Sequence, residues 1–291
     1  MGVSRRLIGC LVVAALSLTA GCSRLVDTFL YFPEKGPFGA PGAVGLEYED
    51  VWFPAADGTE LHGWWVPGRR EGPCVVFFHG NAGNVSHRLD ILRRLYDRVG
   101  LGVLLFDYRG YGRSGGTPTE QGLYSDARGA RNLVRARGWD RRGAILYGRS
   151  LGAAVALQSA SEAKPSGCVL ESAFTSVEDM ARHHYPVLSH LLMPWLRGQF
   201  PSLERVRHLE CPTLFLHGDQ DKISPIGMGW RLFDAASEPK RFRTIRGAGH
   251  DDLGFVGGDD YWTAWEEFIK EVEAKRASTT AADAALHAGG R

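Results

Sequence analysis

The sequence has no excess of charge of either sign. Its 34 lysine and arginine residues nearly balance its 33 aspartate and glutamate residues, so the formal net charge at pH 7 is +1. No stripe of lysine and arginine stands out along the chain. A protein that binds DNA or RNA through the phosphate backbone needs such a basic surface. The missing stripe therefore excludes a nucleic-acid partner.

Cysteine is scarce as well, and the spacing of the five cysteines excludes a further class of protein. The sequence holds no Cys-x-x-Cys pair and no cluster of cysteine and histidine, which are the spacings that metal sites need. We therefore predict no bound metal and no cofactor. Cys74, Cys168 and Cys211 each begin or directly precede an apolar run, which is typical of a buried, reduced thiol. A Cys168–Cys211 disulfide is the alternative in an oxidising compartment.

Internal repeats are absent too, and what is present is the composition of an ordinary globular protein. The 291 residues, 44% of them hydrophobic, suffice for one sizeable core. Alternating residues at Leu46–Phe53 and Thr59–Val66 flank Asp57-Gly58 and predict a β-hairpin. Apolar runs that alternate with helical patterns follow, and they favour a mostly parallel sheet covered on both faces. We predict one α/β domain over residues 46–276, with further strands at 73–78, 102–107, 144–147, 168–170, 213–216 and 241–245.

Two segments depart from this alternation. Residues 176–209 have no strand pattern but hold many apolar residues, interrupted by Pro186, Pro194 and Pro201. We predict short broken helices that form a lid over the carboxyl edge of the sheet; the alternative is that these apolar residues only fill the core. Residues 277–291 are rich in alanine, glycine and threonine without apolar periodicity, so we predict a disordered tail.

The first 21 residues have the layout of a secretory signal. Arg5 and Arg6 precede the apolar run Leu7–Ala20, which is short for a membrane span. The run ends in Leu-Thr-Ala-Gly-Cys at 18–22, which resembles the lipobox of bacterial lipoproteins. That resemblance implies cleavage after residue 21 and acylation of Cys22. A simple signal peptide or an uncleaved anchor is the alternative.

An acylated Cys22 would anchor the chain to a membrane, because several acyl chains on one residue hold firmly to a bilayer. We therefore predict a membrane-anchored lipoprotein of the bacterial cell envelope, on the periplasmic or extracellular face. Residues 22–45 are rich in glycine and proline and show little periodicity. We interpret them as a tether laid along the surface of the domain.

A serine stands at the centre of the most informative pattern. Gly148–Gly152 reads Gly-Arg-Ser-Leu-Gly, between a buried strand pattern at Ala144–Tyr147 and a small-residue helical pattern at Ala153–Ala163. A serine on a sharp strand-to-helix turn leaves no space for side chains two positions before and after it, which explains both glycines. The helix N-terminus then points at the place where an oxyanion would form. The pattern predicts that Ser150 is a nucleophile; an ordinary turn is the alternative.

A serine nucleophile needs a histidine base, which in turn is held by a carboxylate. On a strand–turn–helix serine motif these partners follow in the order acid, then histidine. His250 lies in Gly-Ala-Gly-His-Asp-Asp directly after the last predicted strand, where small neighbours let the imidazole reach over the sheet edge. Asp219 and Asp221 follow the preceding strand. We choose Asp221 because it is nearer to the helix that starts at Pro225, although the spacing does not separate the two.

Several longer strings resemble one known family. They are Phe-Phe-His-Gly-Asn-Ala-Gly-Asn at 77–84, Asp-Tyr-Arg-Gly-Tyr-Gly-Arg-Ser at 107–114, Glu-Gln-Gly-Leu-Tyr-Ser-Asp-Ala at 120–127 and Glu-Ser-Ala-Phe-Thr-Ser at 171–176. Together with the serine motif they are similar to the Bem46-like branch of the serine hydrolases with the α/β-hydrolase fold. The resemblance implies that fold and a triad of Ser150, Asp221 and His250, since the family's Gly-x-x-Asp position falls on Asp221. It also implies an oxyanion hole made by the N–H groups of Leu151 and Asn81.

The prediction for function is a serine hydrolase that cleaves a carboxylic ester or thioester through an acyl-enzyme intermediate. The substrate class is a small-molecule ester or an acyl compound, and the apolar lid and lipid anchor favour acyl chains. A serine peptidase of the same fold is one alternative, although the sequence has no sign of a propeller or other gating domain. A catalytically idle lipoprotein that serves envelope binding is the other.

Overall fold

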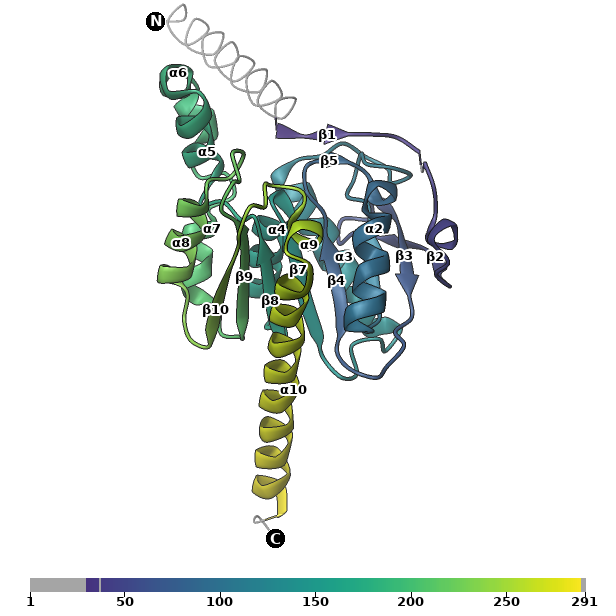
Figure 1. Cartoon of the computed structure of the whole chain (residues 1–291). Helices are drawn as coiled ribbons and strands as arrows, with labels where there is room; N and C mark the ends of the chain where they lie inside the picture. The colour runs from purple at the N-terminus through teal and green to yellow at the C-terminus, as the bar shows by residue number, and fades with distance from the viewer. Residues whose placement is uncertain (1–29, 37, 289–291) are drawn as a thin grey trace, which may run out of the picture.

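The computed structural model describes residues 30–36 and 38–288 (Figure 1). The predicted signal peptide, Cys10 and Cys22 lie outside the described residues. Among the residues that are described, no helix combines the length and the apolar composition that crossing a bilayer requires.

An eight-stranded sheet forms the centre of the described fold, in the order β10-β9-β8-β7-β4-β6-β3-β2. The six strands from β10 to β6 run parallel, whereas β3 is antiparallel to both β6 and β2. The hairpin and the mostly parallel sheet are thus confirmed. The strands are β2 (Glu49–Pro54), β3 (Glu60–Val66), β4 (Cys74–Phe78), β6 (Val103–Phe106), β7 (Ala144–Arg149), β8 (Gly167–Glu171), β9 (Thr213–Gly218) and β10 (Lys240–Ile245).

Helices cover both faces of the sheet, so the parallel strands are buried on both faces. This burial is the reason why these strands read as continuous hydrophobic runs in the sequence. One face packs against α3 (Glu120–Ala136), α4 (Leu151–Glu162) and α8 (Ile226–Ala235). The other packs against α2 (Leu89–Arg94) and the first turns of α10 (Gly258–Ala288), which stand in front of the sheet in Figure 1. Shorter elements are η1 (Pro41–Val44), η2 (Val85–Arg88), η3 (Leu95–Val99) and α9 (Leu253–Val256).

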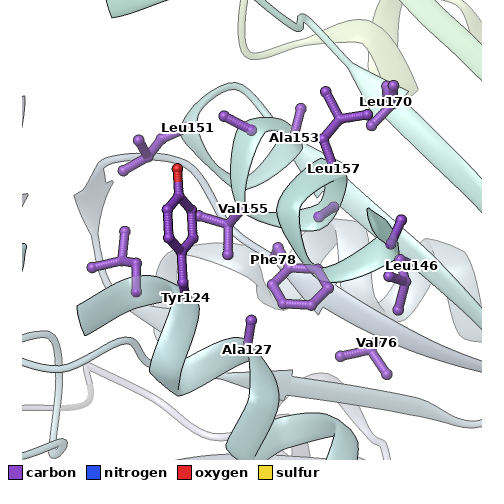
Figure 2. Close-up of a cluster of buried hydrophobic side chains, with 14 of the residues drawn as sticks. Val76, Phe78, Tyr124, Ala127, Leu146, Leu151, Ala153, Val155, Leu157 and Leu170 are labelled. Carbon is purple, nitrogen blue, oxygen red and sulfur yellow. The ribbon is translucent and has the colours of Figure 1, made fainter. Parts of the chain in front are cut away.

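The small side chains of α4 let this helix lie close to the sheet. Ala153, Val155 and Leu157 pack among Phe78 of β4, Leu146 of β7 and the ring of Tyr124 from α3 (Figure 2). All of these side chains are buried. Because α4 is the helix that follows Ser150, its tight packing fixes the position of the serine turn.

The predicted tether is more ordered than we expected over the residues that are described. β1 (Phe32–Pro33) pairs in parallel with β5 (Ala82–Gly83), a short strand in the loop that follows β4. The N–H of Gly36 then donates to the carbonyl oxygen of Gly112, and the N–H of Gly112 donates to that of Glu34. Only glycine and proline content marked this segment in the sequence, and its pairing partner lies about fifty residues away, so local patterns did not reveal it.

The predicted lid consists of short helices, namely α5 (Val177–His184), α6 (Pro186–Leu196), α7 (Ser202–Arg205) and η4 (Val206–His208). Pro186 begins α6, and Pro201 precedes α7, as proline at a helix start should. Pro194 was expected to end a helix but lies inside the last turn of α6. Leu196 and Phe200 join the core, whereas the first half of α6 is exposed apart from the buried Ser189.

The disordered tail predicted over 277–291 is wrong for its described part. α10 continues as a helix through Ala288. Alanine has the highest helix propensity of all residues, so the alanine-rich composition extends the helix even without an apolar stripe to bury.

The three cysteines are free and buried, as predicted, and no Cys168–Cys211 disulfide forms. Burial raises the pKa of the Cys74 thiol to about 12, so it stays protonated and inert.

Candidate active site

Ser150 lies on a strained turn between β7 and α4. Its φ of 53° and ψ of −117° lie in a region that non-glycine residues rarely adopt. The neighbouring glycines permit this turn, since a Cβ on Gly152 would lie 1.9 Å from the carbonyl oxygen of Phe78 and one on Gly148 would lie 2.4 Å from that of Gly152. The steric reason for the two glycines is therefore confirmed.

The register of the parallel strands brings three loops to the same edge as this turn. Phe78 at the end of β4 pairs with Gly148, so the loop that begins at His79 leaves the sheet beside Ser150. Ile245 at the end of β10 pairs with Gly218 at the end of β9. Because parallel strands end at one edge, the loops that carry Asp221 and His250 start side by side.

His250 contacts Asp221 directly. The distance from His250 Nδ1 to Asp221 Oδ2 is 2.8 Å. A carboxylate can only accept at this contact, so Nδ1 carries the proton, which leaves Nε2 of a neutral imidazole as a free base. Asp221 Oδ1 accepts the backbone N–H groups of Ile223 and Ser224 at 2.9 and 2.8 Å. The carboxylate is thus fixed by its own loop.

The surroundings of Asp221 keep it ionised. Burial of the carboxyl raises its pKa, but hydrogen bonds from His217 and His250 and from the Ser224 N–H outweigh burial and hold the pKa well below its usual range. His217 Nε2 donates to the carbonyl oxygen of Ser224 at 2.7 Å and lies 3.3 Å from Asp221 Oδ2. A negative Asp221 orients the His250 ring and favours its imidazolium form.

The two aspartates that the sequence did not separate have different roles in the structure. Asp219 is exposed and accepts the N–H of Gly247 at 2.7 Å, so it braces the loop before His250 and does not contact the imidazole. Gly218 is required between the two loops, because a Cβ there would lie 2.2 Å from the carbonyl oxygen of Ala248. Among the two candidates, Asp221 is the carboxylate that reaches His250.

A buried ion pair that sequence reasoning missed fixes the backbone at His250. Arg149 Nη2 donates to the carbonyl oxygen of His250 at 3.3 Å and to Asp251 Oδ1 at 3.0 Å. Its Nε lies 3.1 Å from Glu171 Oε1, and Glu171 Oε2 accepts the hydroxyls of Tyr147 and Tyr261 at 2.7 and 2.6 Å. The sequence held two signals for this ion pair. One is Arg149, which lies between the two glycines of the serine motif, and the other is Glu171, which ends an apolar strand.

Ser150 and His250 are connected through this ion pair. Arg149 directly precedes Ser150, and the same guanidinium holds the His250 carbonyl. Within the described structure Ser150 Oγ forms no hydrogen bond with His250 Nε2. Such a bond is often long in a ligand-free enzyme and tightens when substrate binds. The structure therefore joins Asp221 to His250 and leaves the serine contact as a prediction.

The two predicted oxyanion donors come from different segments, Leu151 from the start of α4 and Asn81 from the loop after β4. Leu151 is the first residue of α4, where backbone N–H groups have no partner within the helix. Gly80 lies beside the serine, since a Cβ added to Gly80 would lie 3.8 Å from Ser150 Cβ. Asn81 is the next residue along this loop. Asn81 Nδ2 donates to Leu30 O at 3.1 Å, and its carbonyl accepts the N–H of Phe32 at 3.0 Å and the hydroxyl of Tyr111 at 2.8 Å. These bonds fix the loop without using the Asn81 N–H.

Polar residues beside the site brace these loops. Arg109 bonds Asp126 through its backbone N–H and its guanidinium at 2.7–2.9 Å, so it braces the loop that follows β6. Burial lowers the pKa of His79 to about 4, and its Nδ1–H donates to Gly80 O at 2.7 Å. His79 therefore supports the loop as a neutral ring. No group of three or more potential metal ligands occurs within the described part of the chain.

The chain resembles proteins of known sequence over most of its length. Residues 71–205 match the family model described as serine aminopeptidase, S33. An uncharacterized protein of Mycobacterium tuberculosis is 39% identical over 246 residues, which is 84% of this chain and 86% of that protein. WAV2 of Arabidopsis thaliana, an α/β hydrolase domain-containing protein, is 33% identical over 81% of this chain and 83% of the WAV2 chain. Bem46 of Schizosaccharomyces pombe is 30% identical, with 83% and 85% covered.

Solved structures with the same backbone arrangement are more distant in sequence. An esterase of Pyrococcus furiosus superposes with a TM-score of 0.69 at 19% identity, over 83% of this chain and 98% of the esterase. An α/β hydrolase from a Penicillium species has a TM-score of 0.62 at 19% identity and covers 79% of this chain and 100% of its own. At this level of identity the likeness concerns the fold alone.

Proposed function

Since the chain belongs to the α/β-hydrolase superfamily, whose fold it has, we propose that it is a serine hydrolase that cleaves carboxylic esters or thioesters. Ser150 is the nucleophile, His250 the general base and acid, and Asp221 the carboxylate that orients His250. The observation that supports this most strongly is the 2.8 Å contact between His250 Nδ1 and Asp221 Oδ2 at the sheet edge where the strained Ser150 turn lies.

The reaction follows from the positions of these groups. His250 Nε2 takes the hydroxyl proton as Ser150 Oγ bonds to the acyl carbon, and the carbonyl oxygen becomes an oxyanion. The N–H groups of Leu151 and Asn81 stabilise that oxyanion, and each donor contributes about 10²- to 10³-fold in rate. The intermediate collapses as the alcohol or thiol leaves with the proton from His250. Water then attacks the acyl-enzyme by the same steps, which releases the acid and restores Ser150.

Labelling with a fluorophosphonate probe tests the nucleophile. The wild-type protein should be labelled and Ser150→Ala should not, while Ser161→Ala on the exposed side of α4 should be labelled like the wild type. Equal labelling of the wild type and Ser150→Ala would contradict the mechanism. Hydrolysis of nitrophenyl esters with increasing acyl length then measures the acyl preference.

A peptidase is the second candidate, because residues 71–205 match a model described as serine aminopeptidase. Esters and amides of the same acyl group separate the two functions. The proposed esterase should cleave aminoacyl nitrophenyl esters and leave the corresponding nitroanilides intact. Cleavage of the nitroanilides at a comparable kcat/KM would favour the peptidase. Absence of both activities and of probe labelling would favour a binding role in the envelope.

We also propose that Cys22 is acylated and holds the protein at a membrane of the bacterial cell envelope, on its periplasmic or extracellular face. The proposal is supported by the apolar run Leu7–Ala20 and the Leu-Thr-Ala-Gly-Cys string that ends it. Radiolabelled palmitate should be incorporated into the wild type and not into Cys22→Ser. Incorporation that persists in Cys22→Ser would contradict it.

A further inference from the structure

The first half of α6 presents large apolar side chains to solvent. We call residues 177–196, which form α5 and α6, the α5–α6 hairpin. At the start of α6 the exposed fractions are 63% for Tyr185, 83% for Val187, 48% for Leu188 and 71% for Leu191. Val187 and Leu191 are four residues apart, so they lie on one face of the helix. A helix of a globular domain normally turns such a face to the core.

Within residues 30–36 and 38–288, no other element covers the exposed side chains of α6. Ser189 and Leu196 are the buried residues of α6 among those whose burial is described, and α5 is its neighbour along the hairpin. In Figure 1 the hairpin rises above the sheet, clear of α3, α4 and α10. A cluster of exposed apolar residues of this kind marks a surface that contacts another molecule or a membrane.

The acidic side chains of the hairpin are paired within the protein. On α5, Glu178 lies 2.7 Å from Arg182 and Asp179 lies 3.1 Å from Arg231. From Pro186 to Leu203 the chain contains Arg197 and His190 and no aspartate or glutamate. An apolar helix face with Arg197 just beyond its end fits the interface of a bilayer that contains anionic lipids, where the apolar face enters the acyl boundary and the arginine meets the headgroups.

The described chain begins at the same edge. Leu30 is held beside the serine turn by the bond from Asn81 Nδ2, and β1 then runs along β5. Figure 1 shows β1, β5 and α6 at one end of the molecule and the far end of α10 at the other. The 29 residues that precede Leu30 include the apolar run Leu7–Ala20. Any attachment of those residues to a membrane would turn the hairpin toward the same surface.

We propose that the α5–α6 hairpin docks on the surface of a bilayer that contains anionic lipids, with Tyr185, Val187, Leu188 and Leu191 inserted at the headgroup–acyl boundary. The eleven residues of α6 span about 16 Å at 1.5 Å per residue, so α6 lies along the interface and does not cross it. Docking in this orientation faces the Ser150 turn toward the lipid. The proposal depends neither on hydrolysis nor on acylation of Cys22.

Hydrogen–deuterium exchange of the full-length protein tests the docking directly. Protein bound to vesicles of phosphatidylcholine and phosphatidylglycerol is separated by flotation and compared with free protein. We expect amide exchange in peptides covering 185–196 to slow by about tenfold or more on the vesicles. Peptides from the far end of α10 should exchange equally in both samples. Vesicles of phosphatidylcholine alone should protect the hairpin less, and added salt should reduce the protection.

Two charge-matched variants provide the control. Val187→Glu/Leu191→Glu adds two negative charges on the exposed face of α6 and should abolish the protection. Asn132→Glu/Ser161→Glu adds the same charge at exposed positions of α3 and α4 and should keep it. Thermal unfolding of both variants verifies that they fold, so a loss of protection reports on docking.

Four outcomes would overturn the proposal. The first is unchanged exchange at 185–196 in vesicle-bound protein, and the second is protection that persists in Val187→Glu/Leu191→Glu. The third is protection without vesicles that grows with protein concentration, because a second copy of the chain would then cover α6. The fourth is protection without vesicles that disappears when residues 1–20 are deleted, because the chain's own apolar segment would then cover it.

Discussion

The His250 loop and the α5–α6 hairpin lie at the same edge of the sheet and are held in opposite ways. The His250 loop is fixed by buried polar contacts, among them Asp221 to the ring and Arg149 to the carbonyl. The hairpin exposes apolar side chains and anchors in the core near Leu196. Catalysis needs its reacting groups held within about 0.5 Å of the productive geometry, and these buried contacts restrain His250. The surface that would meet a lipid or an acyl chain is free to adapt.

Replacing the carboxylate of the rigid region should have the largest effect. Asp221→Asn removes the charge that orients His250 and is expected to lower kcat for a nitrophenyl ester by about 10⁴-fold. Asp219→Asn keeps an oxygen that can accept the Gly247 N–H and should stay within about tenfold of the wild type. Similar losses in both variants would mean that the two aspartates are not distinguished by their contacts with His250.

Breaking the buried ion pair should affect stability next. Arg149→Met leaves Glu171 buried without its cation, and we expect a loss of about 3–5 kcal/mol in the free energy of unfolding, measured with urea. Adding Glu171→Gln to Arg149→Met should restore part of that loss, because the two residues are coupled. The exposed pair of Arg243 and Asp260 is the control, and Arg243→Met should change stability by under about 1 kcal/mol. Additive effects of the two buried substitutions would refute the coupling.

The buried His79 should make stability depend on pH. Burial lowers its pKa to about 4 in the folded protein, whereas an unfolded histidine has a pKa of about 6.5. Between these values the unfolded chain binds the additional proton, so stability is full above about pH 6.5 and falls as the pH drops toward 4. The loss approaches about 3 kcal/mol. Urea unfolding at several pH values should show a shallower decline for His79→Gln, and equal declines would assign the effect to other groups.

Substitutions in the adaptable region should have the smallest effect on stability. Val187→Ser/Leu191→Ser removes side chains that are mostly exposed and should change the free energy of unfolding by about 0.5 kcal/mol or less. Val155→Ala in α4 is the comparison, since it removes buried methyl groups and should cost about 1–3 kcal/mol. A large loss from the α6 substitutions would show that the hairpin belongs to the folded core.

Local patterns were enough to predict the fold and the neighbourhood of the site. The apolar runs predicted the parallel strands, and the glycines at 148 and 152 predicted the serine turn, because a short apolar run and a steric limit are both set within a few residues. The spacing in the sequence left Asp219 and Asp221 as the two candidates for the carboxylate that holds His250, and spacing alone did not separate them. Which of them reaches His250 depends on how two loops from β9 and β10 close on each other.

Contacts between distant segments explain what the sequence did not reveal. Arg149 and Glu171 lie 22 residues apart and face each other only because β7 and β8 pair in one register. β1 pairs with residues of the loop after β4, and nothing in its composition indicates a partner. The helix at 277–288 was missed because apolar periodicity was required of it, although alanine propensity alone extends a helix that has already started.

The pairing of β1 with the loop that carries Asn81 has a practical consequence for anyone who prepares this protein. A recombinant version that starts after residue 36 lacks Leu30 and Phe32, and with them two of the three hydrogen bonds that hold Asn81 in place. Such a shortened protein would yield rate constants that describe a damaged catalyst. Versions intended for kinetics or ligand soaking should therefore begin at or before Leu30.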